Sequence, residues 1–312
     1  MPAPPLVSVV VPAYVRTAEQ LHLLQETLST VAAQTCADHE VIVVDDGSPR
    51  AVASQLAGDS RCTVVRQQNA GVAVARNSGI AASSGQHLVF LDADDHLLPT
   101  ALDTALSHLV AHPDCSFVIG PREEMTYEGQ PVSWQVAPPP SAGDPWNLYL
   151  ALLRFDWYII PPSAAMFRRE AVLGIGGFQD PWGADDLDFY LRMARTYRAW
   201  CYQSPAVTRY RRYSASSSRD GERMLRSVRA VYAREWPHVR GSKEAEHAFD
   251  SGLRRLTEIF TDCLVENLQD RARAANWRGA VRSAVTLARE RPHKLLAALA
   301  GAARGVVGPV PG

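Results

Sequence analysis

An apolar run that stops at three carboxylates constrains the fold of this chain more than any other stretch. Leu88 to Leu91 are apolar at successive positions, and Asp92, Asp94 and Asp95 follow at once. A continuous apolar run is typical of a parallel strand that is covered on both faces. Neighbouring carboxylates are very costly to bury without partners, so we expect this strand to end at an edge of a sheet.

The first two of these carboxylates predict a cation site. On an extended backbone, Asp92 and Asp94 project to the same side. Two carboxylates, with water and phosphate oxygens completing the shell, suit a hard divalent cation such as Mg²⁺ or Mn²⁺. By itself the D-x-D pattern favours a solvated acidic turn, so the rest of the chain must decide between the two interpretations.

The first part of the chain alternates strands and helices. Apolar runs predict strands over 6–13, 40–44, 62–65, 88–91 and 116–119. Helical periodicity and helix-start signals predict helices over 19–33, 71–82 and 99–110. This alternation implies parallel crossovers and an α/β fold, a mostly parallel sheet flanked by helices, with ligands at the carboxyl ends of the strands. We therefore expect 12–14, Asp45, Asp46 and 92–95 to lie along one rim.

The alternation ends after Ile119. A stretch rich in Pro, Gly and Ser over 127–145 predicts a long connection. The elements expected next are a strand at 164–167, a short helix at 169–173, a glycine-rich turn at 174–178, a helix at 186–197 and a closing pair of strands at 200–202 and 207–213. From Gly221 on, apolar residues keep helical spacing. The predicted domains are an α/β domain over 1–220 and an all-helical extension over 221–312.

Three roles are open for the helical extension: packing on the main domain, formation of a homodimer, and peripheral contact with a membrane. Its last predicted helix, 289–304, places basic residues around an Ala- and Leu-rich centre. Helices that lie on an acidic membrane surface have this composition, and so do many packed helices.

Composition and charge exclude some classes of protein. Lys and Arg number 32 against 33 Asp and Glu, so no global basic field attracts nucleic acid. The five cysteines are widely spaced and form no C-x-x-C, which predicts reduced thiols in a cytoplasmic protein. No secretory signal is visible, and no uncharged apolar stretch approaches the ~18 residues of a spanning helix. We expect a cytoplasmic location, with any membrane contact at the inner face.

Two further motifs carry groups that bind nucleotides. The carboxylate of Asp46 only accepts hydrogen bonds, so it selects a base with an N–H on its pairing edge, as uracil, thymine and guanine have. A helix cap is the alternative interpretation of Asp45 and Asp46. The segment 69–77 opens a helix at Gly71 and carries Arg76 one turn later, a combination that suits a diphosphate.

The order of these motifs resembles glycosyltransferase family 2, the inverting GT-A enzymes that use nucleotide-diphosphate sugars. The matching segments are Val9–Tyr14, Val41–Ser48, Asn69–Gly79, Phe90–Asp95, Gly176–Phe178 and Gly183–Arg192. They occur in the family's order over roughly residues 6–215. Their joint occurrence is far more specific than any single motif, and the helical C-terminal part is not covered by the resemblance.

The resemblance implies roles for the matching side chains. Those on the donor side are Pro12, Tyr14 and Asp46 around the base, Arg76 near the nucleotide and Asp92 beside the ribose. Asp94 would bind Mn²⁺ or Mg²⁺, which neutralises charge on the departing nucleotide. Asp186 would be the general base, because inversion needs a base on the face opposite the nucleotide. Arg192 is expected to pair with Asp188 at i, i+4 rather than with the base.

Three positions depart from the family pattern: Val15 where Asn is frequent, Asp185 where the first acid is usually Glu, and Tyr213 where a metal-side His is expected. With Tyr213 present, water, Arg211 or Arg212 would complete the metal shell or the grip on the diphosphate. Asp185 is expected to support the base. Trp182, three residues before the acidic pair, is the aromatic residue expected to face the acceptor.

The predicted function is metal-dependent, inverting transfer of a sugar from a nucleotide-diphosphate sugar to a glycan, lipid-linked or small-molecule acceptor. UDP is the favoured nucleotide, with dTDP and GDP open. One alternative is a Mg²⁺-dependent phosphohydrolase of the haloacid dehalogenase type, because 91–94 resembles its nucleophile motif, although that motif expects Thr or Val at His96. The other is a non-catalytic, nucleotide-binding relative, suggested by Tyr213.

Overall fold

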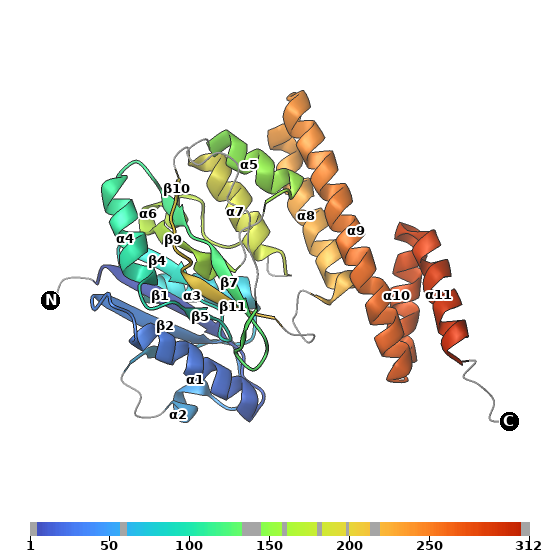
Figure 1. Cartoon of the computed structure of the whole chain (residues 1–312), viewed down its shortest axis with the longest axis horizontal. Helices are drawn as coiled ribbons and strands as arrows, with labels where there is room; N and C mark the ends of the chain where they lie inside the picture. The colour runs from blue at the N-terminus through green and yellow to red at the C-terminus, as the bar shows by residue number, and fades with distance from the viewer. Residues whose placement is uncertain are drawn as a thin grey trace. The chain divides into compact units, whose positions relative to one another are not determined.

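The computed structural model describes residues 5–56, 61–132, 145–157, 161–179, 183–197, 200–212 and 219–306. The chain divides into two units, which Figure 1 shows together. The first comprises Met1–Pro181 and Asp185–Tyr213, and the second comprises Trp182–Ala184 and Ser214–Gly312. The strands belong to the first unit and the second unit is helical.

The largest sheet in the described part of the first unit has seven strands. In spatial order these are β10 (Cys201–Tyr202), β6 (Phe117–Ile119), β9 (Ala165–Arg168), β4 (His87–Phe90), β1 (Val7–Ala13), β2 (His39–Asp45) and β3 (Thr63–Arg66). Neighbouring strands are parallel, except that β9 runs antiparallel to both β4 and β6. The predicted α/β fold with a mostly parallel sheet is confirmed.

The carboxyl ends of β1, β2 and β4 lie at one edge of this sheet. Ala13 at the end of β1 is in register with Asp45 at the end of β2, and Val10 is in register with Phe90 at the end of β4. The N–H of Asp46 continues the ladder by donating to the Ala13 carbonyl at 2.9 Å. The predicted rim is therefore confirmed.

Helices α1 (Ala18–Ala32) and α4 (Ala101–Ala111) cover one face of the sheet. Their buried Leu24 and Leu102 belong to one apolar cluster that includes Val9 of β1. Helix α1 begins after Thr17, whose hydroxyl accepts a hydrogen bond from the N–H of Gln20 at 3.2 Å. Such a cap satisfies one of the unpaired N–H groups at a helix start.

Helices α3 (Val72–Ala82) and α7 (Asp185–Thr196) cover the opposite face. Helix α3 lies so close to β1 that a Cβ on Gly79 would meet a methyl carbon of Val10 at 2.2 Å. Helix α7 reaches the same face through Phe189, whose ring packs edge-on against Phe90 with the centroids 6.0 Å apart. Coverage of both faces explains why the strands read as continuous apolar runs.

A second sheet follows the order β5 (His96–Leu97), β11 (Thr208–Arg211), β7 (Arg122–Met125) and β8 (Pro131–Val132). The predicted closing pair of strands at 200–202 and 207–213 is wrong. Strand β10 pairs in parallel with β6, and β11 pairs in parallel with β7. The segment from β10 to β11 therefore runs alongside the segment from β6 to β7 and does not fold back on itself.

The connection predicted over 127–145 is only partly described. It contains β8, and its residues 133–144 lie outside the described residues. Helix α5 (Pro145–Arg154), which the sequence did not predict, follows it and packs against α7. The other short elements are α2 (Val52–Gln55), a 3₁₀ turn (Pro162–Ala164) and α6 (Arg169–Gly174). The glycine-rich turn after α6 is confirmed, with positive φ at Gly176 and Gly177.

The second unit contains α8 (Gly221–Val239), α9 (Lys243–Arg273), α10 (Trp277–Glu290) and α11 (Pro292–Val306). The side chains that cap the starts of α8, α9 and α10 are Asp220, Ser242 and Asn276. The predicted helix over 289–304 instead begins at Pro292, which suits the first turn of a helix because it lacks an N–H. Within the described ranges, no helix is both long and apolar enough to cross a membrane.

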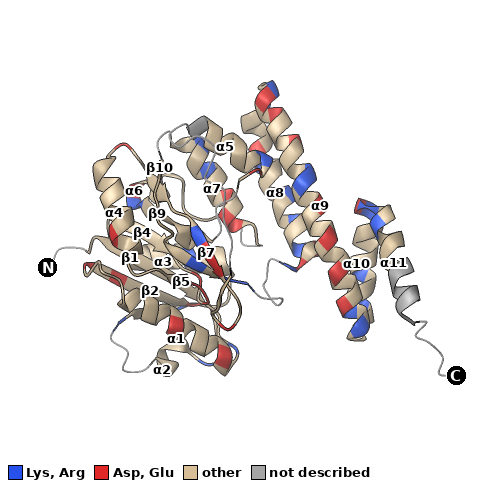
Figure 2. Cartoon of the chain, viewed as in Figure 1, with Lys and Arg blue, Asp and Glu red and all other residues tan. Residues whose placement is uncertain are grey.

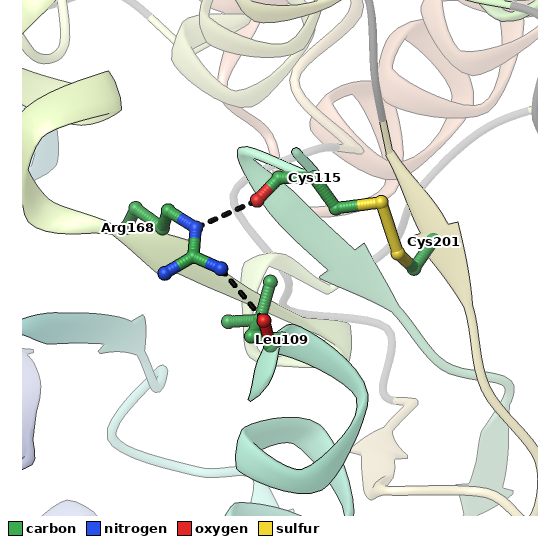
Figure 3. Close-up of a disulfide and its surroundings, with 4 residues drawn as sticks. All are labelled: Leu109, Cys115, Arg168 and Cys201. Carbon is green, nitrogen blue, oxygen red and sulfur yellow. Dashed lines mark hydrogen bonds between the residues drawn. A yellow bond between two sulfur atoms is a disulfide. The ribbon is translucent and has the colours of Figure 1, made fainter. Parts of the chain in front are cut away.

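Cys115 and Cys201 form a disulfide that joins the segment before β6 to β10 (Figure 3). Beside it, Arg168 of β9 donates to the carbonyls of Cys115 and Leu109, each at 2.7 Å. The prediction of reduced thiols is wrong for this pair, because strand pairing brings together cysteines 86 residues apart. The cysteines therefore no longer support the predicted cytoplasmic location. Cys36, Cys62 and Cys263, which also lie in described ranges, are not disulfide-bonded.

Candidate active site

The D-x-D segment forms a turn beyond the end of β4. The N–H of Asp95 donates to the carbonyl of Asp92 at 3.1 Å. The predicted extended backbone at Asp92 and Asp94 is therefore wrong, because the segment turns here. The side chains of Asp92 and Asp94 are partly exposed, whereas Asp95 is fully buried. The three carboxylates therefore have different environments although they are adjacent in sequence.

Arg76 of α3 ties this turn to the start of α7. Its Nη2 pairs with Oδ1 of Asp92 at 2.6 Å, and its Nη1 pairs with Oδ2 of Asp185. The arginine side chain is only 4% exposed, and its guanidinium lies over the ring of Phe178, 5.1 Å from the centroid. One buried cation thus joins two acidic motifs that lie far apart in the sequence.

The charges around Arg76 are unevenly balanced. Burial disfavours the charged guanidinium, but the carboxylates of Asp185, Asp92 and Asp186 outweigh it and raise the pKa of Arg76. Burial raises the pKa of Asp185 to about 7; Arg76 opposes this rise, while Asp186 and Asp92 add to it. The cluster holds more negative than positive charge, so protonation of Asp185 near neutral pH relieves part of the repulsion.

The two acids at the start of α7 differ in accessibility. Asp185 is 5% exposed and its carboxylate is occupied by Arg76. Asp186 is partly exposed, and its Oδ1 accepts from the N–H of Leu187 at 2.8 Å. Of this pair, Asp186 is the acid that a substrate can reach.

The glycine-rich turn is fixed from both sides. Asn77 of α3 donates to the carbonyl of Phe178 at 2.8 Å and accepts from its N–H at 2.9 Å. The predicted pair of Arg192 with Asp188 is confirmed at 2.8 Å, and Arg192 also donates to the carbonyl of Gly177 at 2.7 Å. These contacts hold the Phe178 ring beneath the guanidinium of Arg76, which explains how the separate motifs define one geometry.

Arg211 at the end of β11 supports the D-x-D turn from behind. It is 2% exposed, its N–H donates to Oδ1 of Asp95 at 2.9 Å, and its Nε donates to the carbonyl of Asp94 at 2.8 Å. The guanidinium also donates to the carbonyl of Tyr127 and, at 2.9 Å, to Glu26 of α1. The sequence placed Arg211 near the metal, but it gave no sign of this supporting role, because Glu26 and Arg211 are 185 residues apart.

Asp95 carries the strongest desolvation in the turn. Burial, followed by the charges of Asp94 and Asp92, raises its pKa well above the usual range. Among the described residues, Oδ2 of Asp95 has no hydrogen-bond partner. The turn therefore concentrates negative charge that contacts within the described chain only partly balance.

Asp45 and Asp46 both organise the backbone of the rim. Asp45 accepts from the N–H groups of Ser48 and Val52, at 2.9 and 3.0 Å. Asp46 accepts from the N–H groups of Ala70 and Gly71, both at 2.9 Å, at the start of α3. Both carboxylates thus act as local caps, and the base-binding role of Asp46 stays a prediction.

The remaining candidate residues are described unevenly. Pro12 is buried within β1, and Tyr14, just beyond the strand, is 43% exposed on the rim. Trp182 and Tyr213 lie outside the described residues. Their roles stay predictions.

The residues of the turn fit a hard divalent cation with few protein ligands. No group of three or more His, Cys, Asp or Glu side chains is arranged as a metal site in the described ranges. The side chains of the turn offer carboxylate oxygens. The pKa of Asp95 is raised by burial and then by the negative charges of Asp94 and Asp92, which a bound cation would offset. Mg²⁺ keeps several water or phosphate ligands beside one or two carboxylates, as this turn would require.

Sequence comparison identifies relatives along much of the chain. The family model "Glycosyl transferase family 2" matches residues 8–175. An uncharacterized glycosyltransferase of Haemophilus influenzae is 28% identical over 214 residues, which are 66% of this chain and 65% of that protein. The succinoglycan biosynthesis protein ExoW of Rhizobium meliloti is 38% identical over 102 residues, 30% of this chain and 31% of that protein. The chain thus spans less than two thirds of the length of either relative.

Solved structures share the fold. The mannosyltransferase PcManGT of Pyrobaculum calidifontis, in complex with GDP-Man and Mn²⁺, aligns with a TM-score of 0.58 at 20% identity, over 98% of this chain and 82% of that chain. S. aureus TarS 1-349, in complex with UDP-GlcNAc, aligns with a TM-score of 0.56 at 15% identity, over 92% of each chain. These likenesses confirm the GT-A fold. The chain belongs to glycosyl transferase family 2, as its motifs predicted.

Proposed function

We propose that this glycosyltransferase moves a sugar from a nucleotide-diphosphate sugar to a hydroxyl group, with inversion and with the help of Mn²⁺ or Mg²⁺. The observation that carries the proposal is the bridge from Asp92 through Arg76 to Asp185. It couples the turn where the donor would bind to the helix start where the base would act. The similar structures that contain GDP-Man with Mn²⁺ and UDP-GlcNAc support a donor of this class.

In this proposal Asp186 is the general base. It accepts the proton of the acceptor hydroxyl while that oxygen forms a bond to the anomeric carbon. The bond from the anomeric carbon to the diphosphate breaks, and the nucleoside diphosphate leaves with the electron pair. Asp186 is favoured over Asp185 because it is partly exposed, whereas Asp185 is buried and paired with Arg76. Asp185 then acts as a support for the helix start.

The donor would lie along the rim. Asp94 would hold the cation, which neutralises charge on the departing diphosphate. Asp92 would lie beside the ribose, oriented by its pair with Arg76. Tyr14, exposed at the end of β1, would stack on the base, and Asp46 would accept its N–H, with UDP the favoured nucleotide. Pro12 would fix the backbone beside that base.

Asp186→Asn tests the assignment. A general base contributes about 10²- to 10⁴-fold to the rate, so kcat should fall by that factor while donor affinity, measured by calorimetry with Mn²⁺, stays unchanged. Glu170→Gln is the matched control, because Glu170 is an exposed acid in the first turn of α6. Turnover by Asp186→Asn at the unmodified rate would refute the role of Asp186, and a loss of donor binding would show that the residue acts in binding instead.

A further inference from the structure

Helix α10 of the second unit exposes an apolar stripe. Trp277, Val281 and Val285 are 65%, 60% and 45% exposed, and their spacing of four residues places them on one side of the helix. Another side of the helix carries the buried Ala280 and Leu287, and α10 packs against α9. The exposed stripe is therefore separate from the surface through which α10 packs in the helical unit.

A row of arginines borders this stripe. Arg278, Arg282 and Arg289 lie at helical positions next to the apolar residues, and all three are exposed. In the described ranges none of their guanidinium groups has a hydrogen bond or ion pair, and Figure 2 shows blue positions along α10. The one acidic residue of α10, Glu290, is already paired with Arg229 at 2.6 Å. The face combines exposed apolar side chains with uncompensated positive charge.

The neighbouring helix α11 is less suited to bind an anionic surface. Its Lys294 is paired with Glu258 and Asp262 of α9, at 2.6 and 2.7 Å, and Arg291, just before the helix, pairs with Glu258 at 3.2 Å. These charges serve contacts inside the helical unit. The membrane contact that the sequence suggested for the last helix is therefore better supported for α10.

We propose that α10 docks on the surface of an anionic lipid bilayer. An amphipathic helix with arginines on its polar side and Trp among its apolar residues has the chemistry of the interface, where Trp lies at the headgroup level and arginines meet phosphates. A second copy of the chain fits less well, because the one acid of α10, Glu290, is already paired with Arg229, so this face offers no free acid to the arginines of another copy. None of these residues belongs to the candidate active site described above, so the proposal does not depend on the transfer reaction.

The three arginines give an estimate of how strongly the face should bind anionic lipid. Each basic residue near an anionic leaflet strengthens binding by about fivefold, so three contribute about 100-fold. The whole chain has a net charge of -1 and is not attracted to such a surface by its overall charge. Binding must then come from the local face, and salt should weaken it because the Debye length shrinks to about 3 Å at 1 M.

Co-flotation of the full chain with lipid vesicles tests the proposal. We expect binding to vesicles that contain phosphatidylglycerol and little binding to vesicles of pure phosphatidylcholine. R278Q/R282Q/R289Q should weaken binding by about 100-fold, and V281S/V285S should also weaken it. R50Q/R226Q/R240Q is the matched control, because it removes the same charge from exposed positions outside α10.

Each outcome bears on the proposal. Equal loss of binding in both triple arginine variants would overturn it, because net charge and not the α10 face would then be responsible. Absence of vesicle binding by the unmodified chain would also overturn it. If sedimentation showed a dimer that V281S/V285S dissociates, the face would belong to a second copy. Circular dichroism of the variants checks that the helices are retained, so loss of fold is distinguished from loss of the face.

Discussion

Replacing Arg76 with methionine removes the shared cation of two carboxylates. Removing one partner of a buried ion pair costs about 3–5 kcal/mol, because the other charge is left uncompensated. Of the two carboxylates that Arg76 pairs with, Asp185 is the one left uncompensated, because its side chain is only 7% exposed. The side chain of Asp92 is 30% exposed, so water can solvate it. For a unit of roughly 200 residues each kcal/mol shifts Tm by about 2–4 °C, so we expect a fall of about 6–20 °C in scanning calorimetry.

The pH dependence makes this prediction specific. At pH 5 Asp185 is largely protonated, since its pKa is about 7 beside Arg76, and little attraction to Arg76 is lost. Above pH 7 the unmodified chain ionises Asp185 next to Arg76, whereas the variant lacks the charge that lowers the pKa of Asp185 and must keep this carboxyl protonated or leave it unpaired. The Tm difference between the unmodified chain and Arg76→Met should therefore grow as pH rises through 7. Adding Asp185→Asn should recover part of the loss, because it removes the unpaired carboxylate. A difference that is constant with pH, or strictly additive effects in the double variant, would refute the reasoning.

Three further predictions concern the same unit. Burial raises the pKa of Asp185 in the folded chain, so the stability that its protonated form contributes is present below about pH 4 and is lost as pH rises to about 7. In that range the free energy of unfolding should fall by up to about 1.4 kcal/mol per pH unit, and Asp185→Asn should remove this slope in chemical unfolding. Reduction of the Cys115–Cys201 disulfide, checked by mass spectrometry, should lower stability by about 2–4 kcal/mol, and an unchanged Tm would show that the bond does not stabilise the fold. Arg211→Lys cannot reproduce the fork of contacts behind the D-x-D turn, so it should lower Tm and weaken donor binding, and an unchanged donor Kd would argue against a supporting role.

The elements that the sequence predicted well are those with strong local signals. Apolar runs located β1, β2 and β4, and parallel crossovers then placed their ends along one rim. The glycine-rich turn and the pair of Arg192 with Asp188 were also accessible, because each depends on residues a few positions apart. Where residues a few positions apart determine the local structure, hydrophobic periodicity and turn residues were sufficient to predict it.

The features that escaped prediction depend on distant partners. The pair of Arg76 and Asp185 joins residues 109 positions apart, and no local sequence pattern around either residue indicates its partner. Strands β10 and β11 are too short for their partners to be recognised from their own sequences, so they were paired with each other. The disulfide followed from the placement of β10 beside β6, and it could not be inferred while that neighbour was unknown.

The antiparallel strand β9 has a consequence for how such a chain can diversify. Because β9 runs against β6 and β4, its first residue, Ala165, lies opposite the last residue of β6, Ile119, at the edge that carries the D-x-D turn. The 45 positions between Ile119 and Ala165 therefore leave the sheet and return to it at a single edge. The exposed positions of this segment can change without shifting the register of any central strand, whereas β7 and α5 are held by β11 and α7.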